Sequence, residues 1–386
     1  MNSLRIAVVG GGIAGLTAVI ALCRNGHEVD LFEAAPQWGD VGAGITLAPN
    51  AMRGLDAVGV GPEITAAGVE PTTQTIGHWH TGKILMTVDR RDTSERYGAG
   101  YVYIHRADLH AILVAAAEAA GARIHLAKSL INVDISGDKP QLQFADGSSA
   151  DADLVVGADG LKSQVRKQFD PAPPHFTGHI AYRALAQPTP EIQALIDQPG
   201  MHIGPGKQVV RYPLRKGKLL NLVFFARQDG WAEDGWSIPA DSAELTELFA
   251  DWCLDVRRLV QAVKPGTVFK WAINAHQPLS HWSLNNNLTL IGDAAHAMTP
   301  FLGQGAATGI EDAVILARAI DDSSSLKEAL SRYESARFDR TTFIQLESNE
   351  NADRLQGEET ELYGLVNLRN EETLGLFAYD CVNEPV

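Results

Sequence analysis

The chain has few cysteines and no excess of positive charge. Its three cysteines, Cys23, Cys253 and Cys381, lie far apart in a sequence of 386 residues. They form neither a metal-binding motif nor a disulfide framework, as is typical of a protein from a reducing cytoplasm. The formal net charge of −15 argues against duplex nucleic acid and anionic membranes as partners. We therefore expect a cytoplasmic protein without a metal site, in which local arginines capture any anionic ligand.

The sequence also lacks an apolar run of the kind that spans a membrane. The most apolar stretch, residues 6–23, is interrupted by glycines and has neither the positive flank nor the cleavage site of a signal segment. Repeats and low-complexity segments are absent as well. With 386 residues, 45% of them hydrophobic and 20% charged, the chain has the composition of a globular protein with room for two domains.

The most informative stretch is residues 5–33. Four apolar residues, Ile6–Val9, predict a fully buried strand, and a glycine-rich turn and an apolar helix follow. A second apolar strand ends at Glu33, at the spacing expected of a carboxylate that binds a ribose hydroxyl. Because the free N–H groups and the positive dipole end of the helix face the turn, this stretch predicts a dinucleotide site.

Three glycines of this turn have different predicted roles. Gly10 allows the tight turn itself, Gly12 lets the backbone approach a pyrophosphate, and Gly15 lets the helix pack closely on the strand. A plain glycine-rich turn is the alternative interpretation. The strand before the turn and the acidic residue after it favour the dinucleotide.

Two later stretches repeat the pattern of a buried strand that runs into a glycine turn. The strand at 152–157 leads to Asp159, and the strand at 288–291 leads to Asp293 and then to a glycine-rich segment at 303–306. Ligands bind at the carboxyl ends of the strands in open α/β sheets, and a helix start stabilises an anion. Both stretches are therefore candidate binding elements.

The middle of the chain is rich in β-strand patterns. Residues 75–88 predict an antiparallel hairpin, and residues 176–272 predict a separate antiparallel sheet with a helical pattern over 243–262. The strands of that sheet are expected at 180–186, 209–214, 219–226 and 268–273. His78 and His80 alternate on the hairpin, and without a third ligand we interpret them as ordinary strand residues.

Together with Arg106, the three motifs resemble, in order and spacing, the FAD-binding motifs of the single-component flavoprotein aromatic monooxygenases, the group of salicylate hydroxylase and 4-hydroxybenzoate hydroxylase. The resemblance extends from Arg5 to about Arg340. It is closer to the salicylate hydroxylases and 6-hydroxynicotinate 3-monooxygenases, through the run 42–50, the strand 212–215 and the overall length.

The resemblance implies an α/β fold. A discontinuous, Rossmann-like FAD-binding domain with a parallel sheet would be joined to an antiparallel β-sheet substrate domain and to C-terminal helices. Apart from the resemblance, the acidic tail from Glu358 onward predicts a capping helix followed by an irregular end. The FAD-binding domain is expected at 1–70, 100–172 and 280–320. The substrate domain is expected at 71–99 and 173–279, and the C-terminal helical region at 321–386.

The resemblance also assigns residues to parts of FAD, from the adenosine end to the flavin ring. Those at the pyrophosphate would be Gly10, Gly12, Ala14 and Gly15. Those at the adenosine would be Glu33 and Ala34, on the ribose side, and the backbone of Leu130. Those at the ribityl and phosphate region would be Arg106, Asp159 and Asp293, with Asp159 also contacting NAD(P)H. Those at the isoalloxazine would be Gly44, Thr46, Gly303, Gly305 and Ala306.

The reaction implied by the resemblance uses NAD(P)H as a transient co-substrate. NAD(P)H reduces non-covalently bound FAD and leaves, because no second Rossmann motif would hold it. Reduced flavin and O₂ give a C4a-hydroperoxide, which transfers oxygen to a ring carbon ortho or para to a hydroxyl group. The expected partners are a small aromatic, phenolic acid-like substrate, O₂ and NAD(P)H. The expected assembly is a monomer or a homodimer.

Two positions differ from the hydroxynicotinate enzymes, which have histidines where this chain has Thr46 and Phe301. Thr46 forms hydrogen bonds but does not titrate near neutral pH, and Phe301 indicates a more apolar pocket. We expect the substrate ring between the strand of Tyr212 and the turn that contains Pro300. The candidate catalytic residues are Thr46, Tyr212, Pro300 and Phe301.

The alternation of strand residues leaves two choices open. Arg211 and Tyr212 point to opposite faces of their strand, as do Tyr182 and Arg183, so at most one of each pair faces the pocket. Other functions also stay open. They are a flavin monooxygenase that modifies a larger polycyclic or antibiotic-type substrate, a flavin reductase, and a non-catalytic flavoprotein.

Overall fold

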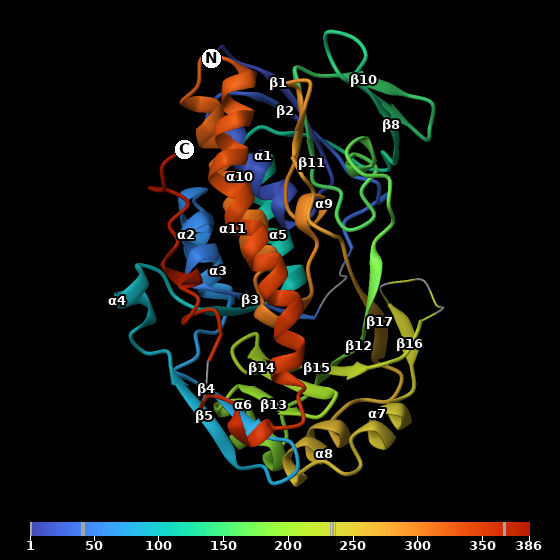
Figure 1. The fold of residues 1–386 in the computed structure, drawn as a ribbon. Coiled ribbons are helices and arrows are strands. Elements are labelled where there is room, and N and C mark those ends of the chain that lie inside the picture. Colours follow the sequence, from blue (N-terminus) through green and yellow to red (C-terminus); the bar gives the residue numbers. More distant parts are fainter. Residues whose placement is uncertain (1, 40–42, 232, 234, 236, 366–367) are drawn as a thin grey trace.

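The computed structural model describes residues 2–39, 43–231, 233, 235, 237–365 and 368–386. Figure 1 shows two large sheets at opposite ends of the molecule, with the long helix α11 (Leu326–Leu355) running from one to the other. A six-stranded, mostly parallel sheet lies at the end near the N-terminus, and an eight-stranded, mostly antiparallel sheet lies at the other end. This arrangement confirms the predicted α/β fold with a parallel sheet, an antiparallel sheet and C-terminal helices.

The strands that precede the glycine motifs are neighbours in the six-stranded sheet. The strand order is β18-β19-β11-β1-β2-β7, parallel throughout except for the edge pair β18–β19. These strands are β1 (Arg5–Val9), β2 (Glu28–Phe32), β7 (Arg123–His125), β11 (Leu154–Gly157), β18 (Ser283–Leu284) and β19 (Leu288–Leu290). Because parallel strands end on the same side, the turns after β1, β11 and β19 meet at one edge of the sheet.

Helix α1 (Ile13–Arg24) is buried because it packs between α5 (Arg106–Ala119) and α10 (Gly305–Asp321). The approach of α10 is close: a Cβ atom at Gly309 would lie 2.9 Å from the Cβ of Ala14. The tight packing brings the first turn of α10 next to the glycine turn at the start of α1.

The eight-stranded sheet has the order β16-β17-β12-β15-β14-β13-β4-β5. All neighbours are antiparallel except β13 and β4, which are parallel. Its strands are β4 (Thr73–His78), β5 (Ile84–Asp89), β12 (His175–Ala186), β13 (Gly200–Gly204), β14 (Lys207–Leu214), β15 (Leu219–Arg227), β16 (Ile238–Ala240) and β17 (Val268–Ala275). The predicted hairpin thus forms the β4–β5 edge of this sheet.

The two faces of the eight-stranded sheet have different surroundings. One face packs on the short helices α6 (Gln193–Asp197), α7 (Ser242–Leu248) and α8 (Leu254–Gln261), and we call it the helix face. The other face contacts the end of α11 and the turn that contains Phe301, and we call it the inner face. Figure 1 shows α7 and α8 outside this sheet, away from the six-stranded sheet.

Smaller elements connect these parts. A two-stranded antiparallel ribbon pairs β3 (Gly44–Leu47) with β6 (Val102–His105), and a three-stranded sheet has the order β10-β9-β8. The remaining named elements are β8 (Leu130–Asp134), β9 (Gln141–Phe144), β10 (Ser149–Asp151), α2 (Pro49–Ala57), α3 (Gly61–Ala67), α4 (Thr93–Tyr97) and α9 (Asp293–His296). The β3–β6 ribbon contacts β14 through β6 and so lies beside the inner face.

Two further segments differ from a single regular helix. The helical pattern over 243–262 forms two helices, α7 and α8, and between them the backbone N–H of Cys253 donates to the carbonyl of Trp79. After Asp159, whose carboxylate accepts the backbone N–H groups of Gln164 and Val165, the chain forms only a short 3-10 turn, Arg166–Gln168.

The acidic tail also differs from its prediction. In its described residues, 358–365 and 368–386, it has two short 3-10 turns, Thr360–Leu362 and Leu376–Ala378, instead of a capping helix. Its carbonyl groups accept hydrogen bonds from arginines on several helices: Arg53, Arg318, Arg332 and Arg340. Strands β13 and β16 were not expected. Strand β13 is short and begins and ends with glycine, and β16 has three residues with a central proline.

Candidate functional site

The glycines of the turn after β1 have different surroundings: Gly10 and Gly15 are packed against backbone, and Gly12 is not. Gly10 has φ +102°, and a Cβ atom there would lie 2.4 Å from the carbonyl oxygen of Ala158. A Cβ atom at Gly15 would lie 2.0 Å from the carbonyl oxygen of Gly10. At Gly12 the same atom would meet nothing within 4 Å among the described residues. The backbone at Gly12 therefore borders open space.

Gly12 is also the N-cap of α1, and no side chain among the described residues caps it. The first N–H groups of a helix need acceptors, and the helix dipole favours a negative one. Open space beside uncapped helix N–H groups suits a phosphate group. The residues of this turn therefore fit the pyrophosphate of a dinucleotide.

Glu33 directly follows β2, the neighbour of β1, and so lies at the same edge of the six-stranded sheet as the glycine turn. Its carboxylate accepts hydrogen bonds from the backbone N–H of Gly11 (2.7 Å) and of Ala35 (2.8 Å). A carboxylate has about four lone-pair sites, so capacity remains for a ribose hydroxyl. Ala34 is exposed beside it. The backbone N–H of Lys128 donates to the carbonyl of Glu33, which brings the chain just before Leu130 to this place.

Asp293 and Arg106 lie near each other at this edge. Both side chains are exposed, yet removal from bulk water raises the pKa of Asp293 and lowers that of Arg106. Attraction between the two charges opposes both changes. A Cβ atom at Gly305 would lie 4.0 Å from Asp293, so the start of α10 lies next to this pair of charges.

A buried ion network holds the turn that carries Asp293. The carboxylate of Asp312 accepts from His296 Nε2 (2.6 Å), from Arg337 Nε (2.8 Å) and from the backbone N–H of Gly292 (3.0 Å). Burial would raise the pKa of Asp312, but His296 and Arg337 hold it below its usual value. Gly292, at φ +59°, is thereby fixed where the backbone turns into α9.

Asp159 uses its carboxylate mainly within its own turn. It accepts from the Ser163 hydroxyl and from the backbone N–H groups of Gln164 (2.7 Å) and Val165 (3.3 Å). Its burial raises the pKa of the carboxyl group, an effect these hydrogen bonds oppose. The backbone of Asp159 abuts the first glycine turn, since a Cβ atom at Gly10 would lie 2.8 Å from its Cα.

The structure shows which residue of each pair, Arg211 or Tyr212 and Tyr182 or Arg183, lies on which face of the eight-stranded sheet. Tyr182 donates its hydroxyl hydrogen to Glu244 on α7, and Arg211 donates to the carbonyl groups of Leu195 and Gln198, so both lie on the helix face. Because neighbouring residues of a strand alternate, Arg183 and Tyr212 lie on the inner face. The inner face is the one that is turned toward β3 and the turn of Phe301.

Arg183 lies in a hollow on the inner face. Its guanidinium stands over the ring of Trp271 (4.6 Å), and both side chains are half-buried although their strands are central in the sheet. Burial, together with repulsion from Arg106, lowers the pKa of Arg183. The two arginines therefore face a common space. Val210 and Val223, on the neighbouring strands, are also half-buried.

Tyr212 and Phe301 form two borders of this space. The Tyr212 ring stacks on Tyr103 (4.6 Å between centroids), and a Cβ atom at Gly44 would lie 2.2 Å from it. Phe301 is 7% exposed and its ring packs on Phe225, 5.3 Å away. Phe301 is therefore a buried wall, while Pro300 before it is exposed.

Thr46 connects the β3 ribbon to the turn after Phe301. A Cβ atom at Gly303 would lie 3.3 Å from Thr46 Oγ1. The ribbon is also fixed to the sheet, because the buried Asn221 side chain accepts the backbone N–H of Gly44 (2.7 Å). Asn221 was missed from the sequence. Its signal is a single amide inside the apolar strand β15.

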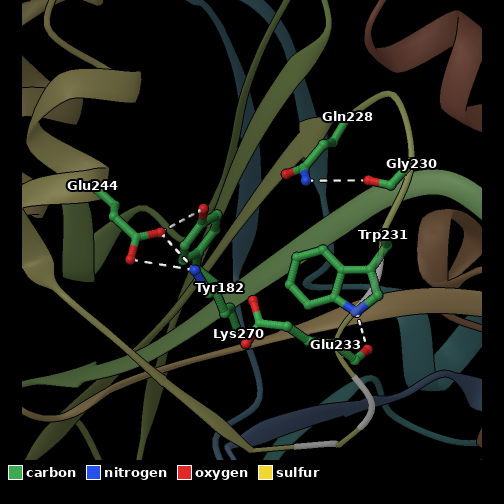
Figure 2. A pocket seen from close by; sticks show the side chains of 7 residues that line it. All are labelled: Tyr182, Gln228, Gly230, Trp231, Glu233, Glu244 and Lys270. Carbon is green, nitrogen blue, oxygen red and sulfur yellow. Dashed lines mark hydrogen bonds and ion pairs between the residues drawn. The ribbon is translucent and has the colours of Figure 1, made fainter.

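A second hollow, of about 480 Å³, lies at the helix face (Figure 2). Its lining residues are Tyr182, Gln228, Gly230, Trp231, Glu233, Glu244 and Lys270. Glu244 accepts hydrogen bonds from Tyr182 and Lys270, as Figure 2 shows. Lys270 and Glu244 thus pair with each other, and the hollow contains none of the residues expected to bind FAD.

Other kinds of site have no support in the described part of the chain. No group of three or more histidine, cysteine or acidic side chains within it could hold a metal ion. His78 instead contacts Glu361 at 3.1 Å. None of the helices in the described ranges combines the length and apolar character needed to cross a membrane.

Comparison with known proteins places this geometry in a family. The FAD binding domain family matches residues 3–344. The 6-hydroxynicotinate 3-monooxygenase of Pseudomonas fluorescens is 33% identical, over 100% of this chain and 97% of its own. The salicylate hydroxylase of Pseudomonas putida is 32% identical, over 94% of this chain and 89% of its own.

A solved structure agrees. HpxO of Klebsiella pneumoniae, complexed with FAD and uric acid, superposes with a TM-score of 0.85 at 26% identity, covering 99% of this chain and 97% of that one. The sequence motifs, the fold and the relatives agree, and FAD is the cofactor. The chain belongs to the FAD-binding family and is a flavin-dependent aromatic hydroxylase.

Proposed function

We propose that this enzyme uses NAD(P)H and O₂ to hydroxylate a small phenolic or heteroaromatic carboxylic acid. The observation that carries the proposal is Arg183, a half-buried cation on the inner face that makes no hydrogen bond to any described residue. A guanidinium with unused donors matches a carboxylate in geometry and charge. The relatives named for hydroxynicotinate and salicylate act on aromatic acids.

The same proposal assigns the cofactor-binding residues. The pyrophosphate would lie at Gly12, the adenosine ribose at Glu33, and the ribityl chain between Asp293 and Arg106. The remaining contacts would come from the positions expected from the sequence: Gly10, Ala14, Gly15, Ala34, Gly44, Thr46, Leu130, Asp159, Gly303, Gly305 and Ala306. When bound, FAD supplies the redox chemistry, accepting a hydride from NAD(P)H and activating O₂.

The protein residues would orient the substrate and exclude water. Arg183 would hold the carboxylate, and the ring would lie along Val210 and Val223. Phe301, whose ring packs on Phe225 of the sheet, would close one side of this space and keep water from the reacting atoms. Burial raises the pKa of Tyr212 well above its usual value, so Tyr212 would donate a hydrogen bond to the ring oxygen rather than act as a base.

The proposed domain division follows the strand membership. Strands β4 and β5 belong to the same sheet as β12 to β17, which supports a substrate domain of 71–99 and 173–279. The six-stranded sheet supports an FAD-binding domain of 1–70, 100–172 and 280–320, with 321–386 as the C-terminal region.

A steady-state screen tests the proposed function. NADH and NADPH oxidation would be followed with hydroxybenzoates, salicylate and hydroxynicotinates, and with neutral phenols of the same size, while hydrogen peroxide is measured separately. We expect hydroxylated acids to stimulate oxidation with less peroxide formed than NAD(P)H consumed, and neutral phenols to stimulate it weakly. Stoichiometric peroxide with every compound would indicate a reductase, and activity only with polycyclic compounds would indicate the larger-substrate alternative.

The glycine turn gives a matched test of the cofactor site. Gly12→Val places its side chain in open space, so the protein should fold but lose FAD. Gly15→Val should instead prevent correct packing of α1, because its Cβ would collide with the Gly10 carbonyl. Flavin content and the melting temperature of each variant measure the two effects. Full flavin occupancy in Gly12→Val would contradict the assignment.

A further inference from the structure

One long segment of this acidic chain has no acidic residue. Residues 198–228 contain six lysines and arginines and no aspartate or glutamate, although the whole chain has 47 acidic residues and a net charge of −15. The segment includes strands β13, β14 and β15 of the eight-stranded sheet. It is therefore a cationic part of the sheet in a protein whose overall charge repels anions.

Four of the six cations are used within the fold. Lys207 donates to the carbonyl of Leu248, Arg211 donates to those of Leu195 and Gln198, Arg215 pairs with Asp108, and Arg227 pairs with Asp353. The other two are Lys216 and Lys218. Both are exposed, and their side chains form no hydrogen bond or ion pair with a described residue. Their charges are thus available to an anion from outside the protein.

Both lysines lie in the turn that joins β14 to β15, residues 215–218, directly after the strand pair Leu214–Leu219. Arg215 (φ +49°) and Lys216 (φ +58°) have left-handed backbone conformations, which asparagine and glycine adopt more readily. The other neighbouring non-glycine residues with positive φ in the described chain are both asparagines, at 285 and 286. The turn thus keeps basic side chains at a cost in backbone strain, as expected if the charges bind a ligand.

The turn lies next to the proposed flavin site. Arg215 Nη2 and Nε donate to the two carboxylate oxygens of Asp108, at 2.8 and 3.0 Å. Asp108 is in the first turn of α5, two residues after Arg106, which the proposed function places at the ribityl chain. Tyr212, three residues before the turn, has its ring against Gly44 of β3. The two lysines therefore stand beside the elements that are expected to hold the flavin ring.

We propose that this turn is the docking site for the phosphate groups of NAD(P)H, and that Lys216 and Lys218 bind them. The inference rests on the proposed function, in which NAD(P)H is the reductant. Both phosphates of the dinucleotide are negatively charged, and NADPH carries a further 2′-phosphate. An aromatic acid has a single carboxylate, for which the proposed function already provides Arg183.

Exposed lysines suit a co-substrate that must leave after it has reacted. The glycine motif at residues 10–15 is assigned to FAD, and the sequence has no second motif of this kind. Exposed charge pairs are individually weak, and they speed the encounter of the partners more than they prolong the complex. NAD(P)H that docks through its phosphates can therefore transfer a hydride to FAD and dissociate as NAD(P)⁺.

Flavin reduction in the FAD-loaded enzyme tests the proposal. In anaerobic stopped-flow experiments, the dependence of the reduction rate on NADH or NADPH concentration gives an apparent Kd and a limiting rate. Lys216→Asn and Lys218→Gln remove the two charges, and asparagine suits the positive φ of residue 216. At low ionic strength we expect the double variant to raise Kd about five- to tenfold and to keep the limiting rate within about twofold.

A matched pair of substitutions controls for overall charge. Arg257→Gln and Lys264→Gln remove as much positive charge from exposed positions on α8 and just after it. This control variant should keep the wild-type Kd. Added salt should reduce the difference between the turn variant and wild type, because exposed charges are screened. A higher Kd for both dinucleotides would assign the turn to the pyrophosphate, and a higher Kd for NADPH alone would assign it to the 2′-phosphate.

Three results would overturn the proposal. They are a wild-type Kd in the turn variant, an equal rise of Kd in the control variant, and a higher KM for an aromatic acid with an unchanged Kd for NADH and NADPH. FAD content and melting temperature identify a variant that loses the fold. Lys218→Gln alone, which leaves the residues with positive φ intact, keeps the test open if Lys216→Asn does so.

The same measurements separate this inference from the proposed function. Hydroxylation of an aromatic acid together with any of the three results would refute the inference alone. A Kd for NAD(P)H that depends on Lys216 and Lys218, in an enzyme that hydroxylates no aromatic acid, would refute the proposed function alone.

Discussion

Two arginines on the same sheet have opposite surroundings. Arg211, on the helix face, is 2% exposed and donates to the carbonyl groups of Leu195 and Gln198 and to Thr75 Oγ1 (3.0 Å). Arg183, on the inner face, is half-buried and contacts the Trp271 ring, with no hydrogen bond inside the described ranges. A cation whose donors are all used stabilises the fold, while one whose donors are unused is placed for a ligand.

The largest effect that would sharpen this comparison is expected at Arg211. Arg211→Met would leave several buried acceptors without donors, each costing about 1–3 kcal/mol. We therefore expect the free energy of unfolding to fall by at least about 3 kcal/mol, measured by urea unfolding of the FAD-free protein. A loss below about 1 kcal/mol would mean that the helix face tolerates the change. Arg211 would then not differ from Arg183 by stabilising the fold.

The matched change on the inner face should affect binding. Arg183→Gln removes the charged partner of a carboxylate, a hydrogen bond of about 1.5–3 kcal/mol, so the KM for an aromatic acid should rise roughly 10- to 100-fold. The free energy of unfolding should change little. A neutral phenol with the same ring is the control, and its KM should stay constant. Equal increases for the acid and the neutral phenol would break the comparison.

The pH dependence of stability gives a third, smaller contrast. Burial and the neighbouring Arg211 lower the pKa of His202, on the helix face, to about 3. An unfolded histidine takes up its proton near pH 6.5, so between these values the unfolded chain binds one more proton than the folded one. The contribution of His202 to stability is complete above about pH 6.5 and falls by up to about 1.4 kcal/mol per pH unit as the pH drops toward 3.

His202→Asn should remove this slope, because asparagine keeps an acceptor for Arg211 but does not titrate. Urea unfolding at pH 7, 6 and 5 would show wild type losing stability faster than the variant. Taking the difference between the two proteins cancels the other buried histidines. If the unfolding free energies of wild type and variant changed equally with pH, His202 would not be the group that takes up the extra proton on unfolding.

The smallest effect is expected at Tyr212. Tyr212→Phe keeps the ring that stacks on Tyr103 and removes the hydroxyl that would orient the substrate. Loss of one hydrogen bond, about 0.5–1.5 kcal/mol, should slow hydroxylation roughly 2- to 10-fold while leaving flavin reduction unchanged. Stopped-flow traces of the two half-reactions separate these rates. Slower reduction with unchanged hydroxylation would place Tyr212 elsewhere in the cycle.

The cofactor end of the molecule could be predicted well because its signals are local. Each motif is a strand that runs into a glycine turn within about 20 residues, and such a unit folds the same way wherever it occurs. The turn of Gly10, the strand β2 before Glu33 and the strand before Asp293 all have the predicted local structure. That the three turns share an edge follows from the parallel order of their strands.

The substrate end could be predicted less well, because its features depend on register between distant strands. Alternation showed that only one of Arg211 and Tyr212 could face inward, but the packing of α6 decides which one. The contact between Asn221 and Gly44 joins residues 177 positions apart. The ion pair between Arg215 and Asp108 joins the sheet to α5. No local pattern encodes these pairings.

The strand order of the six-stranded sheet also has a consequence for how the chain folds. The central strand β1 lies between β2 and β11, and β11 pairs on its other side with β19, at residues 288–290. During synthesis, the edge of β11 that pairs with β19 is apolar and stays unpaired until most of the chain has left the ribosome. Such long sequence separation slows folding and exposes edges that aggregate. Truncated products ending before residue 288 should therefore be substrates for chaperones rather than folded fragments.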